Sequence, residues 1–192
     1  MPPDPERSTL TLERIVDTAL DLIDRAGLDA LSMRKLGAAL GVEAMALYHH
    51  IGSKERLLRA VAARLDREIA DTLEKPGDWL AVLRQMARAC RAAARRHPAA
   101  VPLQAQIESG GKVYLYVVNE RLRAAGVDPL LGALILHVVD CYAMGASLAE
   151  SVRARGGTAT AGAADEIFET GLALVLDRLR ALPMQVAART AR

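Results

Sequence analysis

The stretch VEAMALYHHIGSKERLLRAV, residues 42–61, decides how the chain folds. It begins just after Gly41 with a short apolar segment in which Leu47 and Ile51 recur at helical spacing. That segment ends in Tyr-His-His, and Gly52-Ser53 separates it from a longer helical pattern. Because the aromatic and imidazole side chains fall outside the apolar face, the pattern predicts a short helix whose outer surface contacts a polar partner.

Upstream of this stretch, a second short helix is expected between Ser32, which can cap it, and Gly41, which can end it in a left-handed turn. Two short helices joined by a glycine turn have the spacing of a helix-turn-helix unit. We expect the small Ala38 and Ala39 to let the two helices cross closely. In such units the second helix enters the major groove of DNA, and the first crosses the backbone.

Two longer helices flank this pair. The first is expected from the Thr11 cap to Gly27, with apolar residues at three-four spacing, and the fourth from the Ser53 cap to about residue 73. Charge is distributed unevenly along the same region. Residues 32–64 hold six basic and two acidic residues, a net charge of +4, whereas residues 11–29 have a net charge of −3. The positive charge therefore lies around the helix-turn-helix, as nucleic-acid binding requires.

Residues 12–65 resemble the DNA-binding domain of TetR-family transcriptional regulators. The resemblance rests on Ile15-Val16-(x)2-Ala19-Leu20, Gly27, Leu31-Ser32-Met33-Arg34-Lys35-Leu36, Leu40-Gly41-Val42, Leu47-Tyr48-(x)-His50 and Lys54-(x)2-Leu57-Leu58. The Leu-Tyr-(x)-His form followed by lysine resembles the tetracycline-repressor branch more than the family average. The resemblance implies a dimeric repressor, all-α, with an N-terminal three-helix helix-turn-helix domain linked to a C-terminal helical domain for ligand binding and dimerisation.

The candidate DNA-binding residues follow from both arguments. They comprise the outward positions of the second short helix, one residue on the crossing helix and one at the start of the fourth helix. The full set is Arg34, Glu43, Ala44, Met45, Ala46, Tyr48, His49, His50 and Lys54. The resemblance implies phosphate contacts for Tyr48, His50 and Lys54, and a base or phosphate contact for Arg34. It places Ala44, Met45 and Ala46 at the base edges, where apolar side chains can pack on thymine methyl groups.

The domain organisation is expected to be a loose arm at 1–10, the DNA-binding domain with its linking fourth helix at 11–74, and the C-terminal domain at 75–192. The boundary is placed at Lys75-Pro76-Gly77-Asp78. Further helices are expected at about 78–97, 98–109, 111–125, 128–154 and 164–182. The helix at 128–154 is apolar nearly all round, and it contains His137 and Asp140, which are costly in lipid. We therefore expect a helix buried within protein rather than a membrane span.

A homodimer is expected through the last two helices, because one apolar face packs within the subunit and another needs a partner. The candidate interface residues are Leu134, Tyr142, Gly145, Phe168, Leu172, Val175, Leu176 and Leu179. The alternative is a monomer in which these helices fold inward.

A pocket for a small organic effector is expected in the C-terminal domain, with mostly apolar walls and a few polar groups. The candidate lining residues are Trp79, Met86, Gln104, Ile107, Tyr114, Asn119, His137 and Tyr142. His137 and Cys141 also have the i, i+4 spacing of metal ligands, but a satisfied core histidine is the expectation, and no metal or cofactor is expected. The stripe Arg84, Arg88, Arg91 and Arg95 is expected to be a solvated face, with an anion site as the alternative.

Other classes of protein fit less well. No nucleophile–base pair, glycine-rich phosphate loop or suitably spaced carboxylate pair is present, so no enzyme is expected. Two cysteines and no signal-like opening favour a reduced cytoplasmic protein with two buried thiols. The remaining alternative to a ligand-responsive repressor is a constitutive DNA-binding protein whose core holds no ligand.

Overall fold

The computed structural model describes residues 10–73, 78–106, 112–155 and 161–182, and in these ranges it contains helices and no strand. The all-α prediction is confirmed. In chain order the elements are α1 (Leu12–Ala26), a 3-10 turn (Leu28–Ala30), α2 (Met33–Leu40), α3 (Ala44–Ile51), α4 (Lys54–Asp71), α5 (Trp79–Arg96), α6 (Val101–Gln106), α7 (Val113–Ala124), α8 (Pro129–Arg155) and α9 (Ala161–Arg180).

The helices at the N-terminal end begin and end where the sequence predicts. The hydroxyl oxygens of Thr11, Ser32 and Ser53 each accept a hydrogen bond from the backbone N–H three residues on, capping α1, α2 and α4. Gly41 ends α2 in the left-handed conformation at φ 71°. Three details differ from expectation: a 3-10 turn follows Gly27, α6 begins at Val101 rather than at 98, and α9 begins at Ala161 rather than at 164.

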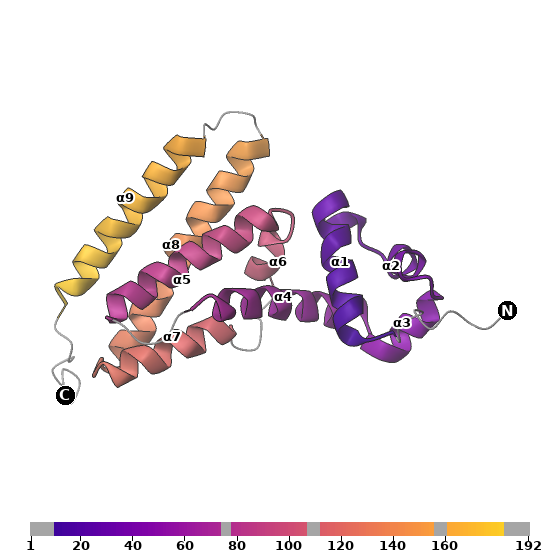
Figure 1. The fold of residues 1–192 in the computed structure, drawn as a ribbon, viewed down its shortest axis with the longest axis horizontal. Coiled ribbons are helices and arrows are strands. Elements are labelled where there is room, and N and C mark those ends of the chain that lie inside the picture. The colour runs from indigo at the N-terminus through magenta and orange to yellow at the C-terminus, as the bar shows by residue number, and fades with distance from the viewer. Residues whose placement is uncertain (1–9, 74–77, 107–111, 156–160, 183–192) are drawn as a thin grey trace, which may run out of the picture.

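Two hydrophobic clusters divide the described residues. One joins α1 to α3 with the first half of α4, mainly through residues between Ile15 and Leu65. The other joins α5, α7, α8 and α9 with Ile69 in the last turn of α4 and Leu73 just after it. Figure 1 shows α1, α2 and α3 together at one end and α4 running from them into the C-terminal bundle. Helix α4 is therefore one continuous element shared by both clusters.

Helix α6 does not follow the sequence-based division into domains. Ala100 and Leu103, beside and within α6, are fully buried in the N-terminal cluster, although they lie well beyond residue 75. Helix α6 also packs on α4 and α8. The segment after α5 therefore connects the C-terminal bundle with the helix-turn-helix.

Helix α8 is not buried on all sides, in contrast to the expectation from sequence. It packs against α5, α7 and α9 through residues such as Ile135, Val139 and Ala143. By length and composition alone, residues 129–153 could cross a membrane. Only 39% of their most apolar 18-residue stretch is buried, so a large part of this helix faces outward. The exposed apolar residues lie at helical spacing along the outer face of the helix, namely Leu130, Leu134, Val138, Leu148 and Val152.

Candidate functional site

The contact between α2 and α3 depends on Gly37. A Cβ atom at this position would lie 2.7 Å from the carbonyl oxygen of Val42 and 3.3 Å from the amide nitrogen of Ala44. The amide of Val42 donates to the carbonyl of Gly37 at 2.9 Å, which closes the turn. The sequence-based expectation assigned this close approach to Ala38 and Ala39, but both are exposed. The absence of a side chain at Gly37 allows the two helices to meet.

Helix α3 presents most of its surface outward. Leu47 and Ile51 are buried against the N-terminal cluster, and Ala44 is half-buried at its edge. The candidate DNA-contacting side chains Glu43, Met45, Tyr48, His49 and His50 are all exposed, and Ala46 is half-buried. Met45 has 69% of its surface exposed, which is a large fraction for an apolar side chain of this size.

Basic side chains lie at the starts of the two helices that flank α3. Arg34 and Lys35 are exposed in the first turn of α2, and Lys54 is exposed at the first position of α4. A cation at a helix N-terminus is unfavourable for the helix dipole, and the first backbone N–H groups there have no intrahelical partner. An anion relieves both effects, so these helix starts suit the phosphates of a nucleic-acid backbone.

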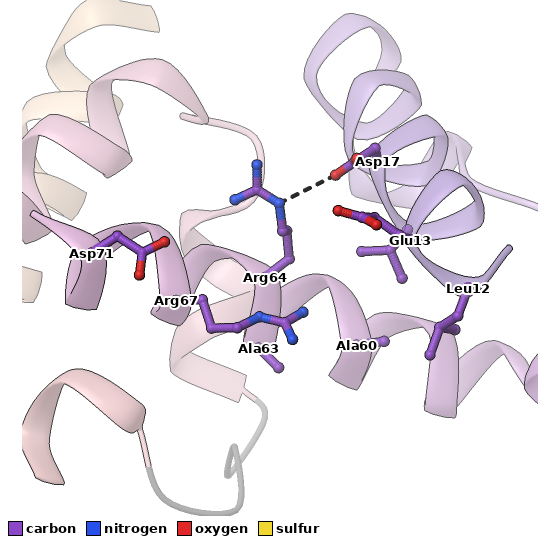
Figure 2. A pocket seen from close by; sticks show the side chains of 9 residues that line it. Leu12, Glu13, Asp17, Ala60, Ala63, Arg64, Arg67 and Asp71 are labelled. Carbon is purple, nitrogen blue, oxygen red and sulfur yellow. Dashed lines mark hydrogen bonds and ion pairs between the residues drawn. The ribbon is translucent and has the colours of Figure 1, made fainter.

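A wide crevice of about 770 Å³ lies on the side of this unit, between α1 and α4. Figure 2 shows the side chains that line the crevice, among them Glu13, Arg67 and Asp71. Arg64 Nε lies 3.2 Å from Asp17 Oδ1 across it. The charges on its walls have both signs, and one of the ion pairs there, Arg64–Asp17, joins α4 to α1. The crevice is therefore lined by charged side chains and is not an apolar pocket.

The expected effector residues do not gather in one place. Asn119 and His137 line a cleft of about 400 Å³ between α7 and α8, together with Lys112 and Asp140. Met86 and Tyr114 are fully buried, Trp79 packs at the edge of the C-terminal cluster, and Tyr142 faces α9. Gln104 lies in α6, but its side chain and all of Ile107 are outside the described residues. The described members of this set therefore do not line one common pocket.

A polar network crosses the C-terminal core beside the α7–α8 cleft. Tyr114 Oη donates to Asp140 Oδ1 at 2.7 Å, and Lys112 Nζ lies 2.7 Å from Asp140 Oδ2. Burial raises the pKa of Tyr114 and raises the pKa of Cys90 to about 12. Both groups are therefore neutral at physiological pH, and both carboxylate oxygens of Asp140 are satisfied.

Three arginines of the α5 stripe form ion pairs with α8 and α9, although Arg84, Arg88 and Arg95 are exposed, as expected, and only Arg91 is buried. Arg88 holds Glu169 of α9 through Nε at 2.9 Å and Nη2 at 2.7 Å. Arg91 pairs with Glu150 of α8 and Asp165 of α9, both at 2.9 Å, and Arg95 pairs with the same two acids. Arg91 is almost fully buried, and its guanidinium carbon lies 4.4 Å from the centre of the Phe168 ring.

These pairs shift the titration of the three acids. Burial alone would raise the pKa of Glu150, but hydrogen bonds from Arg91 and Arg95 outweigh it and hold the pKa below 4.5. Hydrogen bonds from Arg95 and Arg88 likewise lower the pKa of Asp165 and of Glu169. All three acids are therefore charged at neutral pH, where they join α5 to α8 and α9. Sequence reasoning missed this network because its partners lie more than fifty residues away from α5.

Most of the expected interface residues on α9 face the interior of their own chain. Phe168, Leu172, Leu176 and Leu179 are buried in the C-terminal cluster, Val175 packs against it, and Tyr142 Oη donates to the carbonyl of Phe168 at 2.8 Å. The prediction that this stripe forms the interface is wrong, because it already packs on α5 and α8. The outer face of α9 carries Ile167 and Leu174, which are 59% and 68% exposed.

His137 and the cysteines also differ from expectation. His137 and Cys141 are exposed on α8, with Sγ 3.7 Å from Nε2, so neither a core histidine nor a second buried thiol is present. Leu134 and Gly145, two other expected interface residues, lie on this same exposed side of α8. Among the described residues, no group of three or more potential metal ligands is found.

Comparison with known proteins matches residues 15–61 to the family of bacterial regulatory proteins described as the tetR family. The chain is 40% identical over 93 residues to the HTH-type transcriptional repressor DrrR1 of Streptomyces coeruleorubidus, covering 48% of this chain and 34% of that protein. It is 38% identical over 90 residues to the class D tetracycline repressor protein of Escherichia coli, covering 46% and 41%. The chain thus aligns with less than half the length of these two relatives.

Solved structures match over most of the chain. A possible TetR family transcriptional regulator from Streptomyces coelicolor A3(2) is 30% identical, with a TM-score of 0.78 over 90% of this chain and 100% of that one. A single-residue variant of TetR from Acinetobacter baumannii AYE, solved in complex with minocycline, is 26% identical, with a TM-score of 0.77 and coverages of 91% and 100%. BioQ with its double-stranded DNA operator is 28% identical, with a TM-score of 0.70 and coverages of 91% and 100%.

Proposed function

The chain belongs to the TetR family of transcriptional regulators, and on this basis we propose that it is a cytoplasmic homodimeric repressor that a small organic effector releases from its operator. The helix-turn-helix is the observation that carries the proposal. Gly37 and Gly41 bring α2 and α3 together, so that α3 is exposed between two helix starts that carry basic side chains.

In the proposed complex α3 lies in the major groove. Tyr48, His50 and Lys54 contact phosphates, His49 lies beside them, and Arg34 contacts a phosphate or a guanine edge. Glu43, Ala44, Met45 and Ala46 face the bases. Met45 extends furthest into the groove, since it is exposed and lies opposite the buried Leu47. Its apolar side chain suits a thymine methyl group and cannot make the paired hydrogen bonds that recognise guanine or adenine.

The proposed dimer forms through the exposed apolar faces of α8 and α9. Leu134 and Val138 on α8 and Ile167 and Leu174 on α9 would be buried by a second copy. Gly145 lies on the same face of α8, and a Cβ there would meet nothing within 4 Å among the residues that the structure describes. The glycine therefore leaves room for close approach of the partner's helix, as four-helix interfaces require.

The proposed effector binds in the C-terminal domain, at 75–192. Support comes from the relative that was solved with minocycline. Release requires that the effector bind the form unable to hold the operator more tightly than the form that holds it. Helix α4 is suited to transmit this difference, since Leu57 to Leu65 pack on the helix-turn-helix and Ile69 and Leu73 pack on the C-terminal bundle.

The test of DNA binding is selection from a pool of random duplexes by the purified full-length protein. We expect enrichment of two half-sites related by two-fold symmetry, about 10 base pairs apart from centre to centre. Lys54→Ala should weaken binding to every selected sequence and reduce the slope of log affinity against log salt by about one.

Arg180→Ala is the matched control, because Arg180 is an exposed basic residue and the last residue of α9. Figure 1 shows α9 at the opposite end of the molecule from α3. It removes the same charge and should leave affinity and salt slope unchanged. Equal effects of the two substitutions would show that α3 and α4 do not form the DNA surface. Enrichment of single, unpaired half-sites would contradict the proposed dimer.

A further inference from the structure

Two polar side chains interrupt the apolar outer face of α8. His137 and Cys141 are both exposed, and they lie one helical turn apart. Their neighbours on this side of the helix are apolar and also exposed, namely Leu134, Val138 and Leu148. A second copy that covers this face would bury the imidazole and the thiol as well. Burial of polar groups is costly unless they gain partners, so the interface has to supply some.

The two side chains are spaced like two ligands of one metal ion. Cys141 Sγ lies 3.7 Å from Nε2 and 3.8 Å from Nδ1 of His137. In a tetrahedral zinc site, bonds of about 2.3 Å to sulfur and about 2.0 Å to nitrogen place such a pair of ligand atoms about 3.6 Å apart. Thiolate and imidazole together are ligands that Zn²⁺ favours.

One chain supplies only half of such a site. The adjacent Asp140 is already engaged, because Lys112 and Tyr114 hold its two oxygens. No third ligand joins His137 and Cys141 in the part of the chain that the structure describes. A four-ligand site therefore requires a second copy of the same pair.

The exposed apolar stripe of α8 is centred on Cys141. It runs from Leu130 to Val152, and Cys141 lies midway between these two residues. A two-fold axis makes one patch meet its own copy, so an antiparallel pair of α8 helices covers the whole stripe only when the axis passes near its midpoint. The residue at the midpoint then faces the same residue of the partner.

The outer face of α9 has its centre at the same level. The large apolar residues exposed on α9 are Ile167 and Leu174. Gly171 lies between them and packs on Tyr142, since a Cβ there would overlap the Tyr142 hydroxyl. Tyr142 follows Cys141 in α8, so both helices place the middle of their exposed face at this level. An axis that crosses the helices here stacks α8 on the partner's α8.

We propose that the dimer binds one Zn²⁺ ion close to its two-fold axis, through His137 and Cys141 of both copies. The inference rests on the proposed dimer. Two imidazoles and two thiolates complete a closed, tetrahedral structural site. Each Cys141 thiol loses its proton on binding, and the two thiolates balance the charge of the ion. The buried site is thus neutral, and the ion joins the two copies.

The test uses Co²⁺ as the probe, because its absorption reports the geometry and the ligands of a site that suits zinc. The full-length protein is reduced, freed of metal and titrated with Co²⁺. We expect the intense visible bands of tetrahedral cobalt and a near-ultraviolet charge-transfer band from thiolate, both saturating at one ion per dimer. Added Zn²⁺ should abolish both bands and raise the melting temperature of the dimer.

Four substitutions examine the ligands. Cys141→Ser and His137→Ala should each weaken metal binding by at least about tenfold, since even the outer partners of metal ligands change affinity that much. Cys90→Ala is the control for the thiol, because Cys90 is buried within its own chain. His49→Ala is the control for the imidazole, because His49 is exposed on α3. Freed of metal, Cys141→Ser and His137→Ala should unfold as the native protein does.

Sedimentation of the metal-free protein tests the dimer separately. A metal-free dimer without a cobalt spectrum would overturn the zinc site and leave the proposed dimer intact. A protein that is monomeric with and without Zn²⁺ would overturn both. A cobalt spectrum that saturates at one ion per chain, or that persists unchanged in Cys141→Ser, would place the metal elsewhere and overturn the inference.

Discussion

His97 Nδ1 lies 2.6 Å from Asp24 Oδ2, so the end of α5 is tied directly to α1. Its Nε2 atom lies 3.6 Å from Glu68 Oε2 of α4. One imidazole ring thus lies between two acids of the N-terminal unit, while its backbone belongs to the C-terminal bundle. The two units meet through this polar contact as well as through the apolar side chains of α6.

Removing this contact should loosen the N-terminal unit. His97→Ala is expected to lower the free energy of unfolding by about 1 kcal/mol, since a partly buried charge-assisted hydrogen bond is lost. Amide hydrogen exchange in the last turn of α1 should become faster. His137→Ala removes an exposed imidazole and should change neither quantity. Unchanged exchange in His97→Ala would show that the His97–Asp24 contact does not hold the end of α1.

Gly37→Ala should disrupt the helix-turn-helix. The new methyl group would meet the backbone of Val42 and Ala44, which cannot rotate away, so a loss of roughly 1–3 kcal/mol in unfolding free energy is expected. Operator affinity should fall as well, because α3 is displaced. Gly162→Ala in α9 is the control, as no atom of the described residues lies within 4 Å of its added carbon. Urea denaturation and gel-shift titration of both variants provide the comparison.

The two faces of α9 predict opposite results for the same substitution. Leu174→Glu places a charge on the exposed face, so the chain should stay folded, and sedimentation should detect monomers. Leu172→Glu places it in the core, where an unpaired buried charge should unfold the chain. A dimer of unchanged stability in Leu174→Glu would place the interface elsewhere, and a well-folded Leu172→Glu would contradict the packing of α9.

Acid should weaken the contacts of α5 with α8 and α9. The pKa values of Glu150 and Glu169 are below their ordinary 4.5, and that of Asp165 is below its ordinary 3.8. A lowered folded-state pKa contributes stability above the unfolded value, and this contribution is lost as pH falls through the folded value. The contribution of these ion pairs to the melting temperature should therefore change little between pH 7 and about pH 5. The melting temperature should decrease as the pH is lowered below about 4.5.

Glu150→Gln provides the check on this pH dependence. It should lower the melting temperature at pH 7, because Arg91 and Arg95 each lose a charged partner. The decline of the melting temperature below pH 4.5 should be shallower than in the native protein. An equally steep decline would mean that other carboxylates dominate acid unfolding.

The N-terminal helices could be predicted from sequence because their signals are local. Thr11, Ser32 and Ser53 cap helices through bonds to residues three positions away, and Gly41 adopts the turn that its lack of a side chain permits. The role of Gly37 was missed, since a glycine inside a helix shows its purpose only when the neighbouring backbone is placed.

The C-terminal half could not be resolved in the same way. Helix α8 is apolar nearly all round, so periodicity does not distinguish its packed face from its exposed face. On α9 the most regular stripe, including Leu172 and Leu176, is the one that its own chain buries. The partners of Arg91 come from α8 and α9, and no local spacing connects an arginine with acids so distant in sequence.

The burial of Ala100 and Leu103 in the N-terminal cluster matters for anyone who builds chimeric regulators from this chain. A graft cut between residues 74 and 75 would transfer the DNA-reading helices without two side chains that fill their core. The transplanted half would carry a cavity, and the host would have to supply residues of matching shape. A chimera is therefore expected to fold when α6 is transferred together with the N-terminal helices.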